Sequence, residues 1–131
     1  MAEPRVTQGS VIPFSKSKSQ EDIKVVSFNA RSVLSKFHDI ETEVFHVMNY
    51  PEIVCISETW LKPDMPDSLL PFHSKYQIFR KDRKLRNGGG VAIMVRNDLN
   101  CHLVEYDCLS LVEVLCLRVK CNDVEFFIAN F

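Results

Sequence analysis

Residues 23–29 read Ile-Lys-Val-Val-Ser-Phe-Asn, and residues 52–58 read Glu-Ile-Val-Cys-Ile-Ser-Glu. Both runs are short and rich in β-branched residues, which predicts two strands, and the second is apolar enough to be covered on both faces. Between them, apolar side chains at three- and four-residue steps predict an amphipathic helix over about residues 33–49. Ser32 is expected to cap this helix and Pro51 to end it. Strand, helix and strand form a βαβ unit, so the two strands should be parallel.

Two polar residues follow these strands: Asn29 closes the first and Glu58 follows the second. Because parallel strands present their carboxyl ends at one edge, both side chains should lie where open α/β sheets bind ligands. A carboxylate in that position can bind Mg2+ through one oxygen, with water and a substrate phosphate completing the octahedron. Taken alone, Glu58 is better explained as a solvated acid at a strand end, and Asn29 as part of an Asx turn.

The second half of the chain predicts an antiparallel meander. Candidate strands cover residues 76–80, 91–96, 101–106, 112–119 and 124–130, and the first two should pair as a hairpin. Asn122 and Asp123 mark the turn before the last strand. The triplet Gly88-Gly89-Gly90 lacks the Lys-Ser/Thr of a P-loop, so it indicates a close approach of backbone in a hairpin. The fold class is therefore α/β.

A basic loop follows the strand at residues 76–80. Although the chain has 16 Lys and Arg against 17 Asp and Glu, five bases stand here with only Asp82 opposing them: Arg80, Lys81, Arg83, Lys84 and Arg86. Such a loop can contact phosphate without base specificity, so weak and salt-sensitive DNA binding is expected, with Arg80, Arg83, Lys84 and Arg86 as substrate-binding candidates. A solvated loop is the other interpretation of the same run.

Composition limits the class of protein. With 131 residues, 46% of them hydrophobic and 25% charged, the chain suits one globular domain over residues 22–131, after a Ser/Lys/Pro-containing leader at 1–21 that is expected to be flexible. No apolar run can span a membrane and no signal peptide is apparent. Five cysteines without a C-x-x-C pair favour a reducing compartment, so an intracellular location in cytoplasm or nucleus is expected.

Four motifs stand in a fixed order: Val-Val-Ser-Phe-Asn at 25–29, Ile-Ser-Glu-Thr-Trp at 56–60, Arg-Lys-Asp-Arg at 80–83 and Gly-Gly-Gly-Val-Ala-Ile at 88–93. In this combination the chain resembles the endonuclease/exonuclease/phosphatase superfamily, most of all the endonuclease domain of non-LTR (LINE-type) retrotransposons. The resemblance implies a four-layer α/β sandwich and Mg2+-dependent nicking of DNA for retrotransposition. It further implies that Glu58 is the metal-binding carboxylate and that Asn29 is a catalytic residue of the same pocket.

The resemblance covers only the N-terminal half of that domain. The family's later Tyr, Asp-x-Asn and Ser-Asp-His motifs have no counterpart before Phe131, so the chain alone is expected to bind Mg2+ weakly and to be inactive. The alternative is a domesticated, non-catalytic module that binds protein or nucleic acid. Half a sandwich should also leave the inner face of its sheet open, with self-association through residues such as Val114, Cys116, Phe126 and Ile128.

Overall fold

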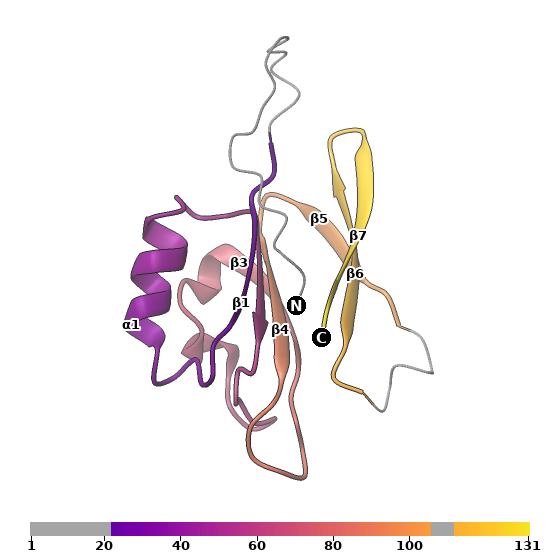
Figure 1. Ribbon diagram of the computed structural model, residues 1–131. Helices are drawn as coiled ribbons and strands as arrows, with labels where there is room; N and C mark the ends of the chain where they lie inside the picture. Colours follow the sequence, from indigo (N-terminus) through magenta and orange to yellow (C-terminus); the bar gives the residue numbers. More distant parts are fainter. Residues whose placement is uncertain (1–21, 106–111) are drawn as a thin grey trace.

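The computed structural model describes residues 22–105 and 112–131, which form one longer helix, two short 3-10 turns and two sheets (Figure 1). The predicted leader at 1–21 lies outside the described residues. In the first sheet the strand order is β1-β2-β4-β3, with β1 at Val25–Asn29, β2 at Ile53–Ser57, β4 at Val91–Arg96 and β3 at Tyr76–Lys81. The second sheet has the order β5-β6-β7, with strands at Asn100–Leu103, Leu115–Cys121 and Val124–Asn130. The predicted α/β class is confirmed.

The first two strands are parallel, as the βαβ pattern predicted. Asn29 is the partner of Ser57 in their register, so Asn29 and Glu58 leave the sheet at the same edge. Every residue of β2 is buried, because β2 lies between β1 and β4 and its two faces are both covered. The prediction of a strand covered on both faces is therefore confirmed.

The remaining strands are antiparallel. β3 and β4 form the predicted hairpin, and β4 also pairs with β2 through the register Ser57–Val91. In the second sheet β6 pairs with β5 and β7, and the turn between β6 and β7 falls at Asn122, whose φ is 55°. The predicted strand at 101–106 is shorter than expected within the described residues and ends at Leu103.

The helix differs from its prediction. Only α1 (Phe37–Asp39) is α-helical, and it continues into the π-helical η1 (Ile40–His46), where Val47 N–H donates to the Thr42 carbonyl five residues back. In a π-helical turn the backbone hydrogen bond spans five residues instead of four. The next side chain on the buried face therefore comes about one residue later than in an α-helix. Phe45 is therefore buried while Val47 is exposed.

The predicted cap of this helix is wrong. Ser32 lies in a turn at φ 88°, and its hydroxyl accepts from Ser35 N–H at 3.3 Å, well before the helix begins. The chain after the helix turns sharply at Asn49 and Tyr50, both with positive φ, so the helical segment ends before Pro51 as expected. Two short 3-10 turns, η2 (Asp67–Leu69) and η3 (His73–Lys75), complete the connection to β3.

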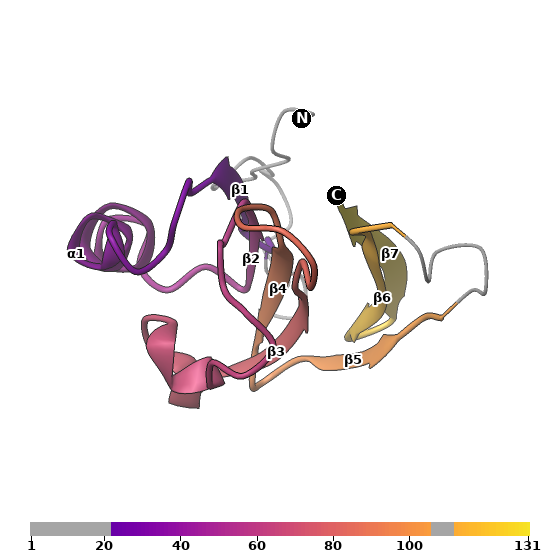
Figure 2. The ribbon, with the colours of Figure 1, turned by 90° about the horizontal axis from the view of Figure 1, so that it is seen from below.

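Three layers bury two apolar clusters (Figure 2). The helix covers one face of the first sheet through Ile40 and Phe45, which pack against Val54 and Ile56 of β2. On the other face, Ile53 and Cys55 of β2 pack against the second sheet, so alternate residues of one strand serve different layers. No helix within the described ranges is long and apolar enough to cross a membrane.

The prediction of an open inner sheet face is wrong, because the two sheets cover one another. The residues of β6 that enter the core between the sheets are Leu115, Leu117 and Val119, which places the predicted Cys116 on the opposite face. A shift of one residue along a strand exchanges its two faces, since successive side chains alternate. Phe126 and Ile128 do pack against this core from β7, as partly buried residues. Self-association through an uncovered inner face is therefore not supported.

The cysteines of the described residues form no disulfide. Cys55, Cys101, Cys116 and Cys121 are free thiols, and Cys108 lies outside the described residues. Burial raises the pKa of Cys55 to about 12, which makes this thiol an unreactive apolar side chain in the core.

Candidate functional site

Asn29 and Glu58 are in direct contact at the carboxyl edge of the first sheet. Asn29 Nδ2 donates to Glu58 Oε2 at 3.1 Å, across the 29 residues that separate them in the chain. The second carboxylate oxygen, Glu58 Oε1, accepts from Trp60 Nε1 at 3.2 Å. We call these three side chains the Glu58 site. The sequence predicted a role for Asn29 and Glu58 and none for Trp60.

The carboxylate of this site is held in its charged form. The hydrogen bond from Asn29, followed by that from Trp60, lowers the pKa of Glu58 below its ordinary value, and the positive charges of Arg31 and Arg83 act in the same direction. A carboxylate that stays ionised near cationic side chains can bind a divalent cation or interact with a phosphate through one. The site therefore has the charge that metal-assisted phosphate chemistry needs.

The backbone that carries the site has an unusual conformation. Glu58 and Trp60 both have positive φ, at 53° and 60°, which costs a residue with a Cβ about 1–3 kcal/mol. Hydrogen bonds from neighbouring segments hold this conformation: Ser32 N–H donates to the Glu58 carbonyl at 3.0 Å, and Trp60 N–H donates to the Gly89 carbonyl at 2.8 Å. Three loops distant in sequence are thus joined around Glu58.

The glycine triplet Gly88–Gly90 provides the close backbone approach that the sequence predicted. A Cβ on Gly90 would lie 2.6 Å from Thr59 Oγ1, and a Cβ on Gly89 would collide with the guanidinium of Arg83. All three glycines have positive φ, between 67° and 89°. Only glycine combines this conformation with such contacts, so the triplet packs directly beneath the Glu58 loop.

The cations of the basic loop have different environments. The guanidinium of Arg80 is bound by Asp82 at 2.7 Å and Asp67 at 2.9 Å, and it also donates to two backbone carbonyls. Arg80 therefore holds the loop together and has little capacity left for a phosphate. Lys84 and Arg86 are exposed, so their side chains remain candidates for phosphate contact.

Arg83 is the loop residue that lies beside the Glu58 site. Its Nε binds Glu113 Oε2 at 2.7 Å, and Glu113 Oε1 accepts from Gly90 N–H, also at 2.7 Å. These contacts with Arg83 and then Gly90 lower the pKa of the Glu113 carboxyl. Glu113 thus fixes both the guanidinium of Arg83 and the start of β4. Nothing in the sequence indicated Glu113, because it lies 30 residues after its partner Arg83.

Asn130 supports the site from the second sheet. Its side chain is buried and donates to the carbonyls of Ile56 at 2.9 Å and Ala92 at 3.0 Å, while Ser57 Oγ donates to Asn130 Oδ1 at 3.3 Å. The residue before Glu58 is therefore tied to the end of β7. An asparagine at the end of an apolar strand was the only signal for this contact in the sequence.

Metal-binding clusters of the usual kind are not found among the described residues, where no group of three or more His, Cys, Asp or Glu could hold an ion. Hydrogen-bond donors to Glu58 are an amide and an indole, and neither group acts as a general base near neutral pH. The Glu58 site thus has a carboxylate that can bind a metal ion and two side chains that orient it. Neither of these two partners can act as a general base.

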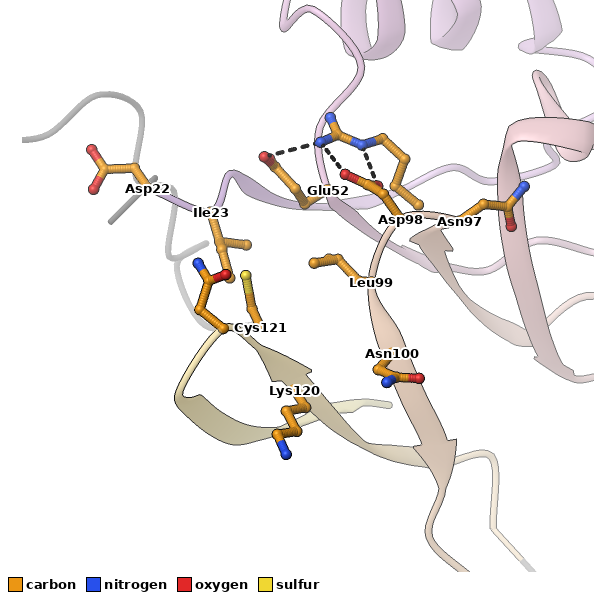
Figure 3. Close-up of a pocket in the computed structure, with 11 residues that line it drawn as sticks. Asp22, Ile23, Glu52, Asn97, Asp98, Leu99, Asn100, Lys120 and Cys121 are labelled. Atoms are coloured by element: carbon orange, nitrogen blue, oxygen red, sulfur yellow. Dashed lines mark hydrogen bonds and ion pairs between the residues drawn. The ribbon is translucent and has the colours of Figure 1, made fainter. Parts of the chain in front are cut away.

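A cavity of about 520 Å³ lies at the other ends of β2 and β4 (Figure 3). Its walls include Glu52, Arg96 and Asp98, whose charges pair with one another: Arg96 binds Asp98 at 2.8 Å and Glu52 at 3.4 Å. Arg96 also donates to the Tyr50 carbonyl at 2.7 Å. Because the guanidinium is engaged by the protein itself, this cavity is a structural feature and a weaker candidate for phosphate binding.

Comparison by sequence finds no protein-family model and no curated protein that match the chain. Comparison by structure does find neighbours. The AP endonuclease LMAP of Leishmania major matches over 92% of this chain with a TM-score of 0.60 and 18% identity. The 3' phosphatase NExo of Neisseria, bound to a product DNA hairpin, matches over 81% with a TM-score of 0.55 and 16% identity.

An AP endonuclease of Archaeoglobus fulgidus also matches over 81% of the chain, with a TM-score of 0.51 and 24% identity. At these identities the likeness is one of fold, and the fold is that of endonuclease/exonuclease/phosphatase structures, as the sequence predicted. The chain spans 44%, 40% and 40% of these three structures, less than half of each.

Proposed function

We propose that this chain supplies part of the active site of a magnesium-dependent nuclease that cleaves phosphodiester bonds in DNA. The contact of Asn29 with Glu58 at the carboxyl ends of two parallel strands carries the proposal, since it places a charged ligand and a polar partner where this fold leaves the sheet edge open. The neighbouring structures support DNA as the substrate, because two are AP endonucleases and NExo is bound to a DNA product.

The residues of the site fit a magnesium ion. Each oxygen of the Glu58 carboxylate accepts one hydrogen bond in the structure, which leaves lone pairs for a metal, and Asn29 Oδ1 is a second oxygen donor nearby. Mg2+ commonly binds one or two carboxylates and fills its octahedron with water and substrate phosphates. When bound, the ion would neutralise charge that develops on the phosphate. Glu58 would hold it, and Asn29 and Trp60 would orient that carboxylate.

Cleavage is expected to need residues beyond those of the Glu58 site. Neither Asn29 nor Trp60 can take a proton from water, and loss of a positioned general base commonly costs ~10²–10⁴-fold in rate. We therefore propose that this chain by itself binds metal weakly and does not cleave. The finer role, DNA nicking for retrotransposition by a LINE-type element, rests on the motif resemblance.

Metal binding can be measured without any cleavage. Trp60 is the only tryptophan and its indole contacts Glu58, so its fluorescence reports on this carboxylate. Titration with paramagnetic Mn2+ should quench the fluorescence saturably, and Mg2+ should compete. Glu58→Gln should abolish the saturable quenching, while Glu43→Gln, an exposed acid of η1, should not. Saturable quenching that persists in Glu58→Gln would overturn the proposed ligand.

Nicking of supercoiled plasmid tests the second half of the proposal. The chain should show only background nicking with Mg2+. Magnesium-dependent nicking that Glu58→Gln abolishes would show that these residues suffice for catalysis and would contradict the proposed inactivity. Nicking that Glu58→Gln leaves unchanged would come from another site.

A second candidate function is a non-catalytic module that binds protein or a second copy of itself. It is favoured by the outer face of β7, where Phe127 is 63% exposed. Within the described residues β7 pairs on one side with β6, so its other edge also offers backbone groups. Phe127→Lys should abolish such association in sedimentation experiments and leave Mn2+ quenching intact. Association unchanged by that substitution would exclude this face.

A further inference from the structure

Trp60 is placed as an exposed aromatic surface next to the charged site. Its side chain is 44% exposed, whereas the flanking Thr59 and Leu61 are buried at 0% and 1%. The hydrogen bond to Glu58 satisfies the only polar group of the indole and fixes the ring, so what remains exposed is apolar π surface. Such a surface is costly to leave in water, and it lies where a ligand of the Glu58 site would be.

The backbone beside the indole carries no side chain. A Cβ on Gly88 would lie 3.7 Å from Trp60 Nε1 and 3.8 Å from Arg83 Nη1, so the two side chains flank the bare backbone of Gly88. An aromatic edge and a guanidinium therefore border the same small strip of surface. Because Gly88 adds no bulk, a flat ligand can approach this strip closely.

Arg83 is held in this position before any ligand binds. Its bond with Glu113 at 2.7 Å, and the contact of its guanidinium with Gly89, restrict the side chain, while Nη1, 3.4 Å from the Asn87 carbonyl, keeps a donor for a phosphate. Preorganisation of this kind lowers the entropic cost of binding. Lys62 adds a further cation, since its Nζ binds Asn87 Oδ1 at 3.0 Å in the loop before the glycine triplet. The surroundings of the indole are accordingly suited to an anionic ligand.

A planar ring and fixed cations side by side match the two parts of a nucleotide. We propose that Trp60 stacks on an unpaired nucleobase while Arg83, positioned by Glu113, contacts the neighbouring phosphate, so that the site takes nucleic acid with a single-stranded or extruded nucleotide. Stacking on an aromatic residue is tolerant of base identity, so no sequence preference is expected. The inference deepens the proposed function by naming the substrate class of the same site, but it requires neither metal nor cleavage.

The test uses oligothymidylate of about 12 nucleotides, a length typical of single-strand sites, and a blunt duplex of equal length, both in buffer with EDTA at low salt. The single strand should quench Trp60 fluorescence strongly and bind about tenfold more tightly than the duplex. Anisotropy of labelled DNA supplies the affinities of variants that lack the fluorophore.

Substitutions separate stacking from charge. Trp60→Ala should weaken single-strand binding by about tenfold or more and leave duplex binding nearly unchanged, whereas Trp60→Phe should retain most of the preference. Leu85→Ala, the removal of another exposed apolar side chain in the basic loop, is the matched control and should change neither affinity. Glu113→Gln should weaken both DNA forms, because Arg83 is no longer held.

Several outcomes would overturn the proposal. Equal single-strand affinity of Trp60→Ala and the parent would do so, provided circular dichroism shows both folded, as would equal binding of an abasic oligomer of the same length. If Mn2+ quenching is lost in Glu58→Gln but the single-strand preference persists, both proposals stand. If the preference is absent while Mn2+ still binds at Glu58, only the stacking proposal fails.

Discussion

The side-chain amide of Asn130 donates a hydrogen bond of 2.9 Å to the carbonyl oxygen of Ile56, which joins the last strand to the strand that precedes Glu58. The same amide reaches Ala92 in β4, so one buried side chain links three strands from two sheets. The position of Glu58 therefore depends on the docking of the second sheet as well as on its own loop.

Asn130→Ala should destabilise the protein by about 1–3 kcal/mol, because it leaves buried carbonyl groups without a donor. Chemical denaturation followed by circular dichroism measures the loss. Asn100→Ala, at the exposed start of β5, is the control and should change stability little. Equal stabilities would mean that water replaces the lost amide at no cost.

Gly90→Ala should lower stability more than Gly88→Ala. Both glycines have φ above 80°, so the backbone strain is similar, but a Cβ at Gly90 lies 2.6 Å from the buried Thr59 Oγ1 and one at Gly88 lies no closer than 3.7 Å to another group. A difference of about 1–3 kcal/mol in the free energy of unfolding is expected. Because the backbone strain is similar in the two variants, the difference between their midpoints of thermal unfolding measures the steric contribution of the added Cβ.

Leu117→Ala should cost about 2–5 kcal/mol, since the side chain is fully buried between the sheets and its removal leaves a cavity. Cys116→Ala, one residue earlier and on the other face of β6, should cost less than about 1 kcal/mol. Urea unfolding of both variants checks the register of β6. The reverse order would place Cys116 on the inner face of the sheet, as the sequence predicted.

Ionisation of Glu58 should be visible in the fluorescence of Trp60. The hydrogen bond from Asn29 and then that from Trp60 lower the pKa of Glu58 in the fold, so these bonds stabilise the folded state above the ordinary value of 4.5. That stabilisation is lost as the pH falls through the lowered pKa. A titration of Trp60 fluorescence should therefore have its midpoint below 4.5.

Glu58→Gln should remove that fluorescence transition. Glu113→Gln should keep it, because Glu113 contacts Arg83 and the backbone of Gly90. A midpoint above 4.5 would contradict the assigned hydrogen bonds, since these favour the charged carboxylate.

The exposed cations of the basic loop should contribute to salt-dependent DNA binding. The double substitution of Lys84 and Arg86 by Ala leaves the Arg83–Glu113 bond intact and should reduce the slope of log K against log salt by about 0.7–0.9 for each lost phosphate contact. The same change at Arg118 and Lys120, exposed on β6, is the control. An unchanged slope in the Lys84 and Arg86 variant would make this loop a solvated turn.

The sequence by itself determined the strands and the meeting of Asn29 with Glu58. Alternation and β-branched runs specify strands locally, and the ends of adjacent parallel strands must share an edge once the βαβ unit forms. It did not determine the helix, because the wider π turns of Ile40–His46 bury Phe45 and leave Val47 exposed. The apolar pattern of this segment is compatible with both α-helical and π-helical turns. Packing against the first sheet selects between them.

Only the tertiary structure decided what surrounds Glu58. Arg83 meets Glu113 across 30 residues, and Asn130 meets Ile56 across 74, so no local pattern could pair them. The face of β6 that turns inward was likewise set by the packing of one sheet on the other, which buries Leu117 and leaves Arg118 exposed. Local periodicity specifies which elements form, whereas contacts between distant segments exist only after burial of the two clusters fixes the layers.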